Sequence, residues 1–219
     1  MDIKRNMQEL NFINTWLGGH DISIDGVKSL IGGKKMISVC EIGCGGGDNL
    51  KAIYSWATKI GMTVDITGID IKQECIDFAK ENCAELPHAN WICSDYSHIV
   101  LPNKPDIIFS SLFCHHFNNQ GVIQIFQWMQ KNSRLGFFIN DLQRHPLAYH
   151  SIRLLTALFS RSYMVKNDAP LSVLRGFSKS ELESIIKTAF GEPATITFEI
   201  HWKWAFRWLL IGYQPLAMK

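Results

Sequence analysis

The stretch Ile37-Ser-Val-Cys-Glu41-Ile-Gly43-Cys-Gly45-Gly-Gly47-Asp48 decides the fold of this 219-residue chain. An apolar run over 36–42 predicts a buried strand, and residues 48–60 have the spacing of an amphipathic helix. The intervening glycines permit positive φ angles and let a ligand approach the backbone closely. The free N–H groups and the positive dipole end of the helix would face the same ligand.

Strand and helix patterns alternate after this stretch. Apolar runs predict further strands over 64–69, 91–93, 106–111 and 136–140, and amphipathic runs predict helices over 73–82 and 120–131. Repeated strand–helix units indicate an α/β fold whose mostly parallel sheet is covered by helices on both faces. The carboxyl ends of the parallel strands then share one edge, where ligands bind in such folds.

Both flanks depart from this alternation within what we expect to be a single domain over 1–219. Residues 1–35 predict a helical N-terminal extension, with short helices over 5–17 and 25–31. Residues 142–190 predict a helical lid inserted between strands five and six. It has a helix over 147–160, a polar irregular stretch over 161–177 and a capped helix over 178–189. Two β-rich runs over 195–202 and 206–213 predict a terminal hairpin.

Composition narrows the class of protein. A hydrophobic content of 47% favours a packed core, and a net charge of +2 argues against an obligate nucleic-acid binder. Six cysteines without a C-x-x-C pair favour reduced thiols and a cytoplasmic location. The dense cluster Cys114-His115-His116 lacks the spacing of a metal site, so we predict no metal. No apolar run is long enough to predict a membrane span or a signal sequence.

The acidic residues around the glycines indicate the kind of ligand. A dinucleotide fingerprint G-x-G-x-x-G requires glycine at position 48, where this chain has Asp48, and an acid there would repel a pyrophosphate. Glu41, two residues before Gly43, suits a ligand with a cationic centre instead. S-adenosylmethionine (SAM) carries both a sulfonium and an ammonium group, so SAM is the predicted cofactor.

Two further acids follow the next strands. Asp70 ends the second predicted strand 23 residues after Gly47, near the offset at which a carboxylate accepts hydrogen bonds from ribose hydroxyls. Asp70 could instead cap the helix over 73–82. Asp95 follows the third strand and could accept from the adenine amine while Tyr96 stacks on the ring. The alternative for Asp95 is a turn residue.

These motifs, together with Asp106-Ile-Ile-Phe-Ser-Ser-Leu-Phe-Cys-His-His-Phe on the fourth strand, resemble class I SAM-dependent methyltransferases. The likeness covers about 36–141 and is greatest to the small-molecule branch with ubiquinone- and menaquinone-biosynthesis methylases. It implies a Rossmann-like seven-stranded sheet of order 3-2-1-4-5-7-6 with strand seven antiparallel. It also implies the residues that bind SAM: Glu41, Gly43, Gly45 and Gly47 along the ligand, Asp70 and Ile71 at the ribose, Asp95 and Tyr96 at the adenine, and Ser110 and Ser111 near the methionine part.

Histidines near the ends of strands four and five are candidates for a catalytic base. A hydroxyl acceptor benefits from a base with a pKa near neutral, and histidine fits. We rank His145 first, followed by His116 and His115, with Arg144 as a clamp for an acidic acceptor. The alternatives are packing roles for His115 and His116, and a helix-capping role for Asp141.

The predicted function is methyl transfer to a small hydrophobic metabolite, at the hydroxyl oxygen of a phenolic, quinol or polyketide-like acceptor. The acceptor could be acidic or carried on a protein, and a homodimer is compatible with the sequence. Carbon methylation of a quinol or polyketide is the close alternative. The sequence also leaves open a methyltransferase-like binding protein without catalysis, a dinucleotide oxidoreductase and an RNA methylase. The RNA methylase is disfavoured because no N-P-P-Y-type tetrad follows strand four.

Overall fold

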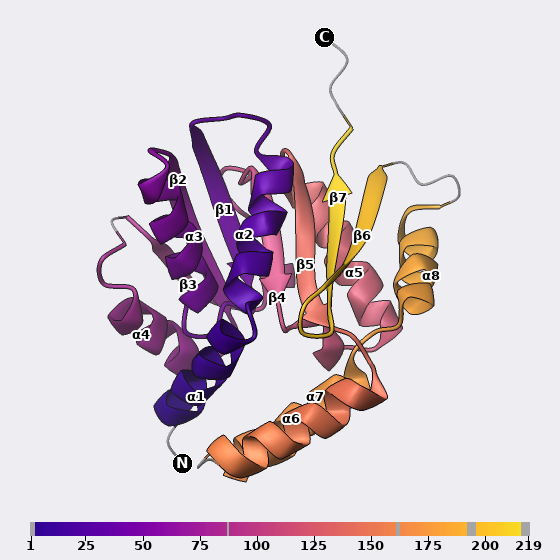
Figure 1. Ribbon diagram of the computed structural model, residues 1–219. Coiled ribbons are helices and arrows are strands. Elements are labelled where there is room, and N and C mark those ends of the chain that lie inside the picture. The colour runs from indigo at the N-terminus through magenta and orange to yellow at the C-terminus, as the bar shows by residue number, and fades with distance from the viewer. Residues whose placement is uncertain (1–2, 87, 161–162, 192–195, 216–219) are drawn as a thin grey trace.

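A computed structural model describes residues 3–86, 88–160, 163–191 and 196–215 of the chain. These residues form a seven-stranded sheet of order β3-β2-β1-β4-β5-β7-β6, with helices on both faces (Figure 1). β7 runs antiparallel to β5 and β6, and the other neighbouring strands are parallel. The predicted fold class is confirmed, including the strand order.

The strands are β1 (Met36–Ile42), β2 (Thr63–Asp70), β3 (Asn90–Cys93), β4 (Ile107–Ser111), β5 (Gly136–Leu142), β6 (Thr197–Lys203) and β7 (Arg207–Tyr213). The helices are α1 (Ile3–Trp16), α2 (Gly19–Leu30), α3 (Asp48–Lys59), α4 (Gln73–Asn82), α5 (Asn119–Asn132), α6 (Pro146–Phe159), α7 (Tyr163–Arg175) and α8 (Lys179–Phe190). Two short 3-10 helices, η1 (Tyr96–His98) and η2 (Cys114–His116), follow β3 and β4.

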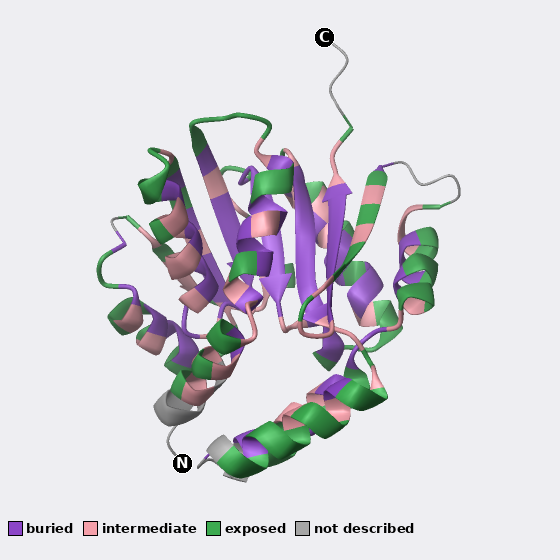
Figure 2. Ribbon diagram, viewed as in Figure 1, coloured by how far each residue is buried: buried purple, intermediate pink, exposed green. Residues whose placement is uncertain are grey.

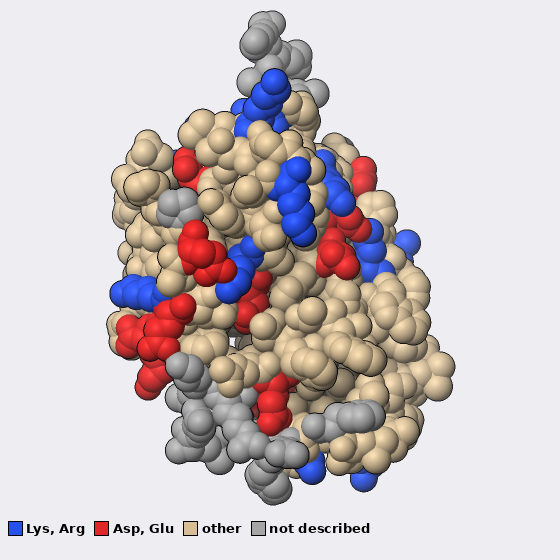
Figure 3. Space-filling model, turned by 60° about the vertical axis from the view of Figure 1, so that its left-hand side comes forward, with Lys and Arg blue, Asp and Glu red and all other residues tan. Residues whose placement is uncertain are grey.

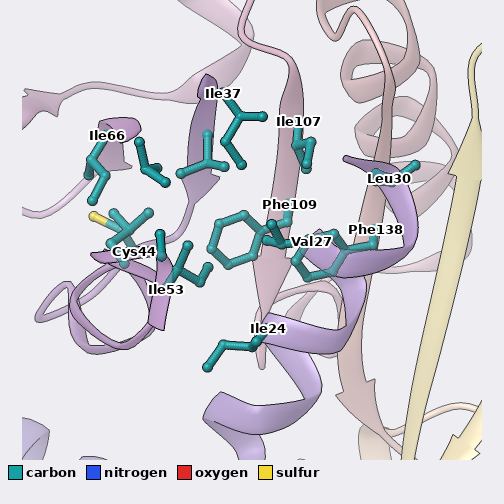
Figure 4. Close-up of a cluster of buried hydrophobic side chains, with 14 of the residues drawn as sticks. Ile24, Val27, Leu30, Ile37, Cys44, Ile53, Ile66, Ile107, Phe109 and Phe138 are labelled. Atoms are coloured by element: carbon teal, nitrogen blue, oxygen red, sulfur yellow. The ribbon is translucent and has the colours of Figure 1, made fainter. Parts of the chain in front are cut away.

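The core lies on both faces of the central strands, which are almost entirely buried (Figure 2). On one face α2 packs against β4 and β5 (Figure 4). There the rings of Phe109 and Phe138 stack with centroids 4.7 Å apart. A Cβ atom on Gly26 would lie 2.7 Å from the Phe138 ring, so this glycine lets α2 approach the sheet. The second helix of the N-terminal extension therefore belongs to the core.

Two sequence predictions about the flanks were wrong. The helix expected from residue 25 begins at Gly19, because only Leu17 and Gly18, the latter with a φ of 72°, separate α1 from α2. The stretch over 161–177 was expected to be irregular, but α7 fills most of it, while residues 161–162 lie outside the described part. An interior proline at 170 obscures the helical pattern of α7, and packing of its buried Val165 and Val173 stabilises the helix instead.

Other boundaries shifted by a few residues. β5 continues beyond the expected Asn140 to Leu142, which brings Asp141 into the sheet. β6 begins at Thr197, and the expected start at residue 195 lies outside the described residues.

Helices cover the carboxyl ends of the parallel strands, which we call the carboxyl edge. α1 lies beyond this edge on one side and the α6–α7 pair on the other (Figure 1), and α1 contacts α7. None of the described helices combines the length and apolarity needed to cross a membrane. Acidic and basic side chains are interspersed on the face seen in Figure 3. The carboxyl edge and its helical cover therefore frame the candidate site.

Candidate active site

The glycine loop between β1 and α3 has the backbone that the sequence requires. Gly43, Gly45 and Gly47 have φ angles of 66°, 52° and 76°, which side chains rarely allow. A Cβ on Gly43 would lie 2.2 Å from the Phe113 ring, and one on Gly47 would lie 2.6 Å from Trp91. A Cβ on Gly45 would meet nothing within 4 Å. Gly45 is therefore the position where a ligand can reach the loop backbone.

Asp70 holds this loop to the end of β2. Its Oδ2 accepts a hydrogen bond of 3.0 Å from the Gly45 backbone, and its Oδ1 accepts one of 2.9 Å from the Lys72 backbone. Lys72 is the N-cap residue of α4, and its own side chain makes no capping bond. Asp70 thus binds both the glycine loop and the residue that precedes α4, while its neighbour Ile71 is exposed.

Glu41 belongs to a buried polar network that sequence analysis missed. Its Oε1 accepts a 3.0 Å hydrogen bond from Asn49, and Asn49 accepts one of 3.1 Å from Ser23. Asn140 donates to Ser23 at 3.1 Å, and Arg207 donates to Asn140 at 3.4 Å. Asn140 and Arg207 interrupt or border apolar strand runs, and that interruption is the signal that could have found them.

The second carboxylate oxygen of Glu41 has no hydrogen-bond partner among the described residues, although it is buried. Burial raises the pKa of Glu41 well above its usual value, and the Asn49 hydrogen bond only partly opposes this. A buried carboxylate that lacks a partner is costly, so it suits a ligand that brings a positive charge. Other buried polar atoms without a partner in the described residues are Asn14 Oδ1, His20 Nε2, Ser111 Oγ, His115 Nε2 and Arg207 Nε.

The residues expected at the adenine form a turn after β3. Oδ1 of Asp95 accepts hydrogen bonds from the backbone and the hydroxyl of Ser97, at 2.9 and 2.8 Å, and caps η1. These bonds lower the pKa of Asp95. The Tyr96 ring meets Trp128 edge-on, with centroids 5.3 Å apart. The turn alternative thus describes Asp95 in this structure.

The serines at the end of β4 are buried. Ser110 Oγ lies 3.3 Å from Cys114 Sγ, and Ser111 Oγ is the unpartnered hydroxyl named above. Both lie on the strand that leads into η2, which carries His115 and His116.

His115 and Asp141 form a buried pair. His115 Nδ1 lies 2.7 Å from Asp141 Oδ1, and the His115 backbone donates to Asp141 Oδ2 at 3.2 Å. Burial raises the pKa of Asp141, but the His115 charge and the hydrogen bonds outweigh burial and leave the pKa below its usual value. An ionised Asp141 only accepts hydrogen bonds, so His115 Nδ1 carries the proton between the two side chains, and Nε2 is the outer nitrogen of the pair.

The other candidate residues at strands four and five have different surroundings. His116 is exposed, unlike His115, and partial desolvation together with the His115 charge lowers its pKa. His145 is the N-cap of α6: its Nδ1 accepts from the Leu147 backbone at 3.2 Å, and its ring stacks on Phe206. Arg144 forms an ion pair with Glu181, which belongs to the capping box of α8. His145, not Asp141, therefore caps the helix that follows β5.

Two cavities lie beneath α1. The larger, of about 540 Å³, is lined by Gln8, Glu9, Phe12, Ile13, Trp16, Leu17, Leu155 and Ser160. The smaller, of about 220 Å³, is lined by Gln8, Asn11, Asp48, Phe78, Glu81 and Asn82. The first is mostly apolar and the second is polar and borders the start of α3. Among the described residues no group of His, Cys, Asp or Glu could hold a metal ion.

A Rossmann-like sheet of this strand order, with a glycine loop flanked by Glu41 and Asp70, defines the class I SAM-dependent methyltransferase fold. Residues 39–136 match the family model described as "Methyltransferase domain". The predicted enzyme class is thereby confirmed for this part of the chain: residues 39–136 form a methyltransferase domain with the fold of SAM-dependent enzymes. The narrower likeness to ubiquinone- and menaquinone-biosynthesis methylases stays a prediction.

Three solved structures similar to this chain are distant from it in sequence. Plantazolicin methyltransferase BpumL in complex with S-adenosylhomocysteine (SAH) has a TM-score of 0.71 and 18% identity, covering 97% of this chain and 90% of that one. Magnesium protoporphyrin IX methyltransferase from Synechocystis PCC 6803 with SAH has a TM-score of 0.58 and 14% identity, with coverages of 93% and 88%. Human N-acetylserotonin methyltransferase with SAM has a TM-score of 0.63 and 15% identity, with coverages of 95% and 54%. No curated protein matches the chain.

Proposed function

We propose that this chain transfers a methyl group from SAM to a hydroxyl oxygen of a small hydrophobic metabolite, with His115 as the general base. The observation that carries this proposal is the buried His115–Asp141 pair. Its outer nitrogen, Nε2, is buried yet has no partner among the described residues. A hydroxyl of the acceptor would satisfy that nitrogen.

The residues around the glycine loop fit SAM. Gly45 leaves open space at the loop backbone, and the unpartnered oxygen of Glu41 suits the ammonium or sulfonium charge. Asp70 and Asp95 each follow a neighbouring strand at the carboxyl edge, where ribose and adenine would lie. When bound, SAM supplies a methyl carbon that its sulfonium makes electrophilic.

His115 and Asp141 would then activate the acceptor. His115 Nε2 takes the hydroxyl proton as the acceptor oxygen becomes the nucleophile, and Asp141 stabilises the imidazolium that forms. When His115 acts as a base, its hydrogen bond to Asp141 would keep the proton on Nδ1 and leave the lone pair on Nε2, the outer nitrogen of the pair. We therefore rank His115 before His116 and His145.

The class of acceptor is supported by the cavity and by the comparisons. Five of the eight residues that line the larger cavity are apolar, and such a lining favours a hydrophobic acceptor. Three of the similar solved structures are methyltransferases named for plantazolicin, magnesium protoporphyrin IX and N-acetylserotonin, and none of these three is named for a nucleic acid. Arg144 is held by Glu181, so an acidic acceptor would have to displace that ion pair to use it.

The test combines isotope-labelled SAM with a panel of phenols, quinols and hydroxylated polyketides, and reads methylated products by mass spectrometry. For an accepted compound, His115→Gln should lower kcat by about 10²–10⁴-fold with SAH affinity unchanged. His201→Gln is the matched control, since His201 is an exposed histidine paired with Glu199 on β6.

Three results would contradict the proposal. An unchanged kcat in His115→Gln would show that His115 is not the general base. A label on carbon would favour the carbon-methylation alternative. SAH binding without turnover of any compound would favour a binding protein.

A further inference from the structure

α6 carries apolar side chains on its solvent side as well as on its packed side. Leu147, Leu154 and Leu158 are 63%, 61% and 67% exposed. Their spacing of seven and four residues places them in one stripe, opposite the buried Ala148 and Thr156. We call these three residues the leucine stripe. A helix that is apolar all round is normally covered on both sides.

α7, which packs against α6, extends this apolar surface and adds positive charge. Leu171 and Leu174 are each 48% exposed. The exposed charged residues on the two helices that the structure describes are Arg153, Lys166, Asp168 and Arg175. Three are basic and one is acidic, so the exposed side chains of the two helices combine leucines with an excess of positive charge.

The same surface leads into the larger cavity. Leu155 follows Leu154 directly and lines the cavity together with Phe12 and Trp16 of α1. Phe12 and Trp16 are themselves largely exposed, so apolar side chains continue from the leucine stripe to the cavity lining. An apolar molecule lying against the stripe could reach the cavity without leaving apolar contact.

We propose that the α6–α7 pair docks on the surface of an anionic lipid bilayer. Exposed leucines enter the boundary between headgroups and acyl chains, and nearby arginines and lysines bind anionic headgroups. A second copy would bring the same excess of positive charge against this surface, whereas an anionic bilayer offers acyl chains to the leucines and negative headgroups to the basic residues. A bilayer therefore matches both the exposed leucines and the positive charge. The larger cavity would then face the acyl chains of the lipids. This inference goes beyond the proposed function and does not depend on the acceptor or the base.

The test is co-sedimentation of the full chain with vesicles of mixed phosphatidylglycerol and phosphatidylcholine, and with vesicles of phosphatidylcholine alone. The chain should bind the mixed vesicles and bind the neutral ones far more weakly. Leu154→Ser with Leu158→Ser should lower the partition coefficient by about tenfold for each leucine. Arg153→Gln with Arg175→Gln should lower it by about fivefold for each charge.

A matched control keeps the experiment specific. Ile60→Ser with Val100→Ser removes two other exposed apolar side chains, 55% and 91% exposed, and should leave vesicle binding unchanged. All variants should bind SAH as the unmodified chain does, because none of these residues lies at the glycine loop. A leucine variant that loses SAH binding is misfolded and cannot be interpreted. In that case the arginine variants, which alter only exposed side chains, test whether the surface binds anionic vesicles.

Several results would overturn the proposal. These are equal binding to neutral and mixed vesicles, no binding to either, or wild-type binding by both the leucine and the arginine variants. A dimer in solution that dissociates on Leu154→Ser would assign the surface to a second copy instead.

Discussion

The carboxyl edge of the sheet and the helices that cover it are built in opposite ways. At the edge, Glu41, His115 and Asp141 are buried, and hydrogen bonds hold each of them in place. In the cover, α6 buries only two of its described side chains, Ala148 and Thr156, and exposes most of the others (Figure 2). The edge is rigidly organised before any ligand binds, whereas the cover presents apolar surface to its surroundings.

This difference separates two tasks within one fold. Chemistry and cofactor binding need groups at set distances, and a packed sheet provides them. Selecting an acceptor needs a surface that can meet different molecules, and helices with few buried residues provide that. Variants in the two regions should therefore fail in different ways.

The largest expected effect is on the free energy of unfolding. It should occur for substitutions in the packed core beside the carboxyl edge and not for substitutions in the helical cover. Phe138→Ala removes a fully buried ring that stacks on Phe109, and should lower the free energy of unfolding by about 3–5 kcal/mol. Leu154→Ala, in the cover, should change it by less than about 0.5 kcal/mol. Urea unfolding of both variants measures the contrast, and equal losses would show that the cover is packed as tightly as the core.

The glycine loop offers the next contrast. Gly43→Ala meets the Phe113 ring at positive φ and should cost about 2–4 kcal/mol of stability. Gly45→Ala should cost only the strain of its φ angle, about 1–2 kcal/mol of stability. It should nevertheless lose most SAH affinity, because the added methyl group would occupy the open space in which the ligand is expected to contact the loop. Gly33→Ala, also at positive φ and unobstructed, is the control for strain alone. Full SAH affinity in Gly45→Ala would show that the ligand does not contact the loop at this position.

Asp70→Ala should weaken SAH binding by about 1.5–3 kcal/mol, because a charged acceptor of ribose hydrogen bonds is lost. Asp65→Ala removes an exposed acid from the same strand and should have no effect on binding. Calorimetry of both variants measures this. If Asp70→Ala binds SAH normally, the carboxylate serves only Gly45 and Lys72.

Glu41 predicts a pH dependence of SAM binding. Burial raises its pKa in the free chain, so the carboxyl keeps its proton to higher pH than an exposed glutamate. The positive charge of SAM favours the ionised form, so binding should release a proton, and affinity should rise with pH by up to about tenfold per unit until that pKa is passed. Calorimetry in buffers of different ionisation enthalpy detects the proton.

Glu41→Gln should remove the proton release and flatten the pH dependence. The same raised pKa has a consequence for the free chain. The raised pKa stabilises the folded chain at low pH, where Glu41 is protonated in both the folded and the unfolded state. This contribution to the free energy of unfolding is lost as the pH rises from the pKa of the unfolded state through the raised pKa of the folded state. Unchanged proton release in Glu41→Gln would assign the effect to another group.

The smallest effect concerns motion of the cover. Residues 146–159 and 163–175 should exchange backbone hydrogens faster than β1 and slow down when an acceptor binds, because few of their side chains are buried. Hydrogen exchange followed by mass spectrometry measures this. Exchange as slow as in β1, with or without acceptor, would rule out a lid over 142–177.

The sequence by itself determined the alternation of strands and helices and the class of enzyme, while the strand order followed from the resemblance to class I methyltransferases. Strand periodicity and the spacing of Glu41, the glycines and Asp70 depend on neighbours along the chain, so they are readable without the fold. A proline at 170 and a double glycine at 18 and 19 misled the analysis, because packing stabilises α7 and α2 where local propensity does not.

Only the tertiary structure decided which polar groups meet. His115 and Asp141 lie 26 residues apart, and Asn140 and Arg207 lie 67 apart, yet each pair is in contact. Their pairing depends on neighbouring strands in the sheet, β4 beside β5 and β5 beside β7, a relation that sequence spacing does not carry. The exposure of the leucine stripe likewise depends on the packing of α6, because an apolar helix face is buried only where another element covers it.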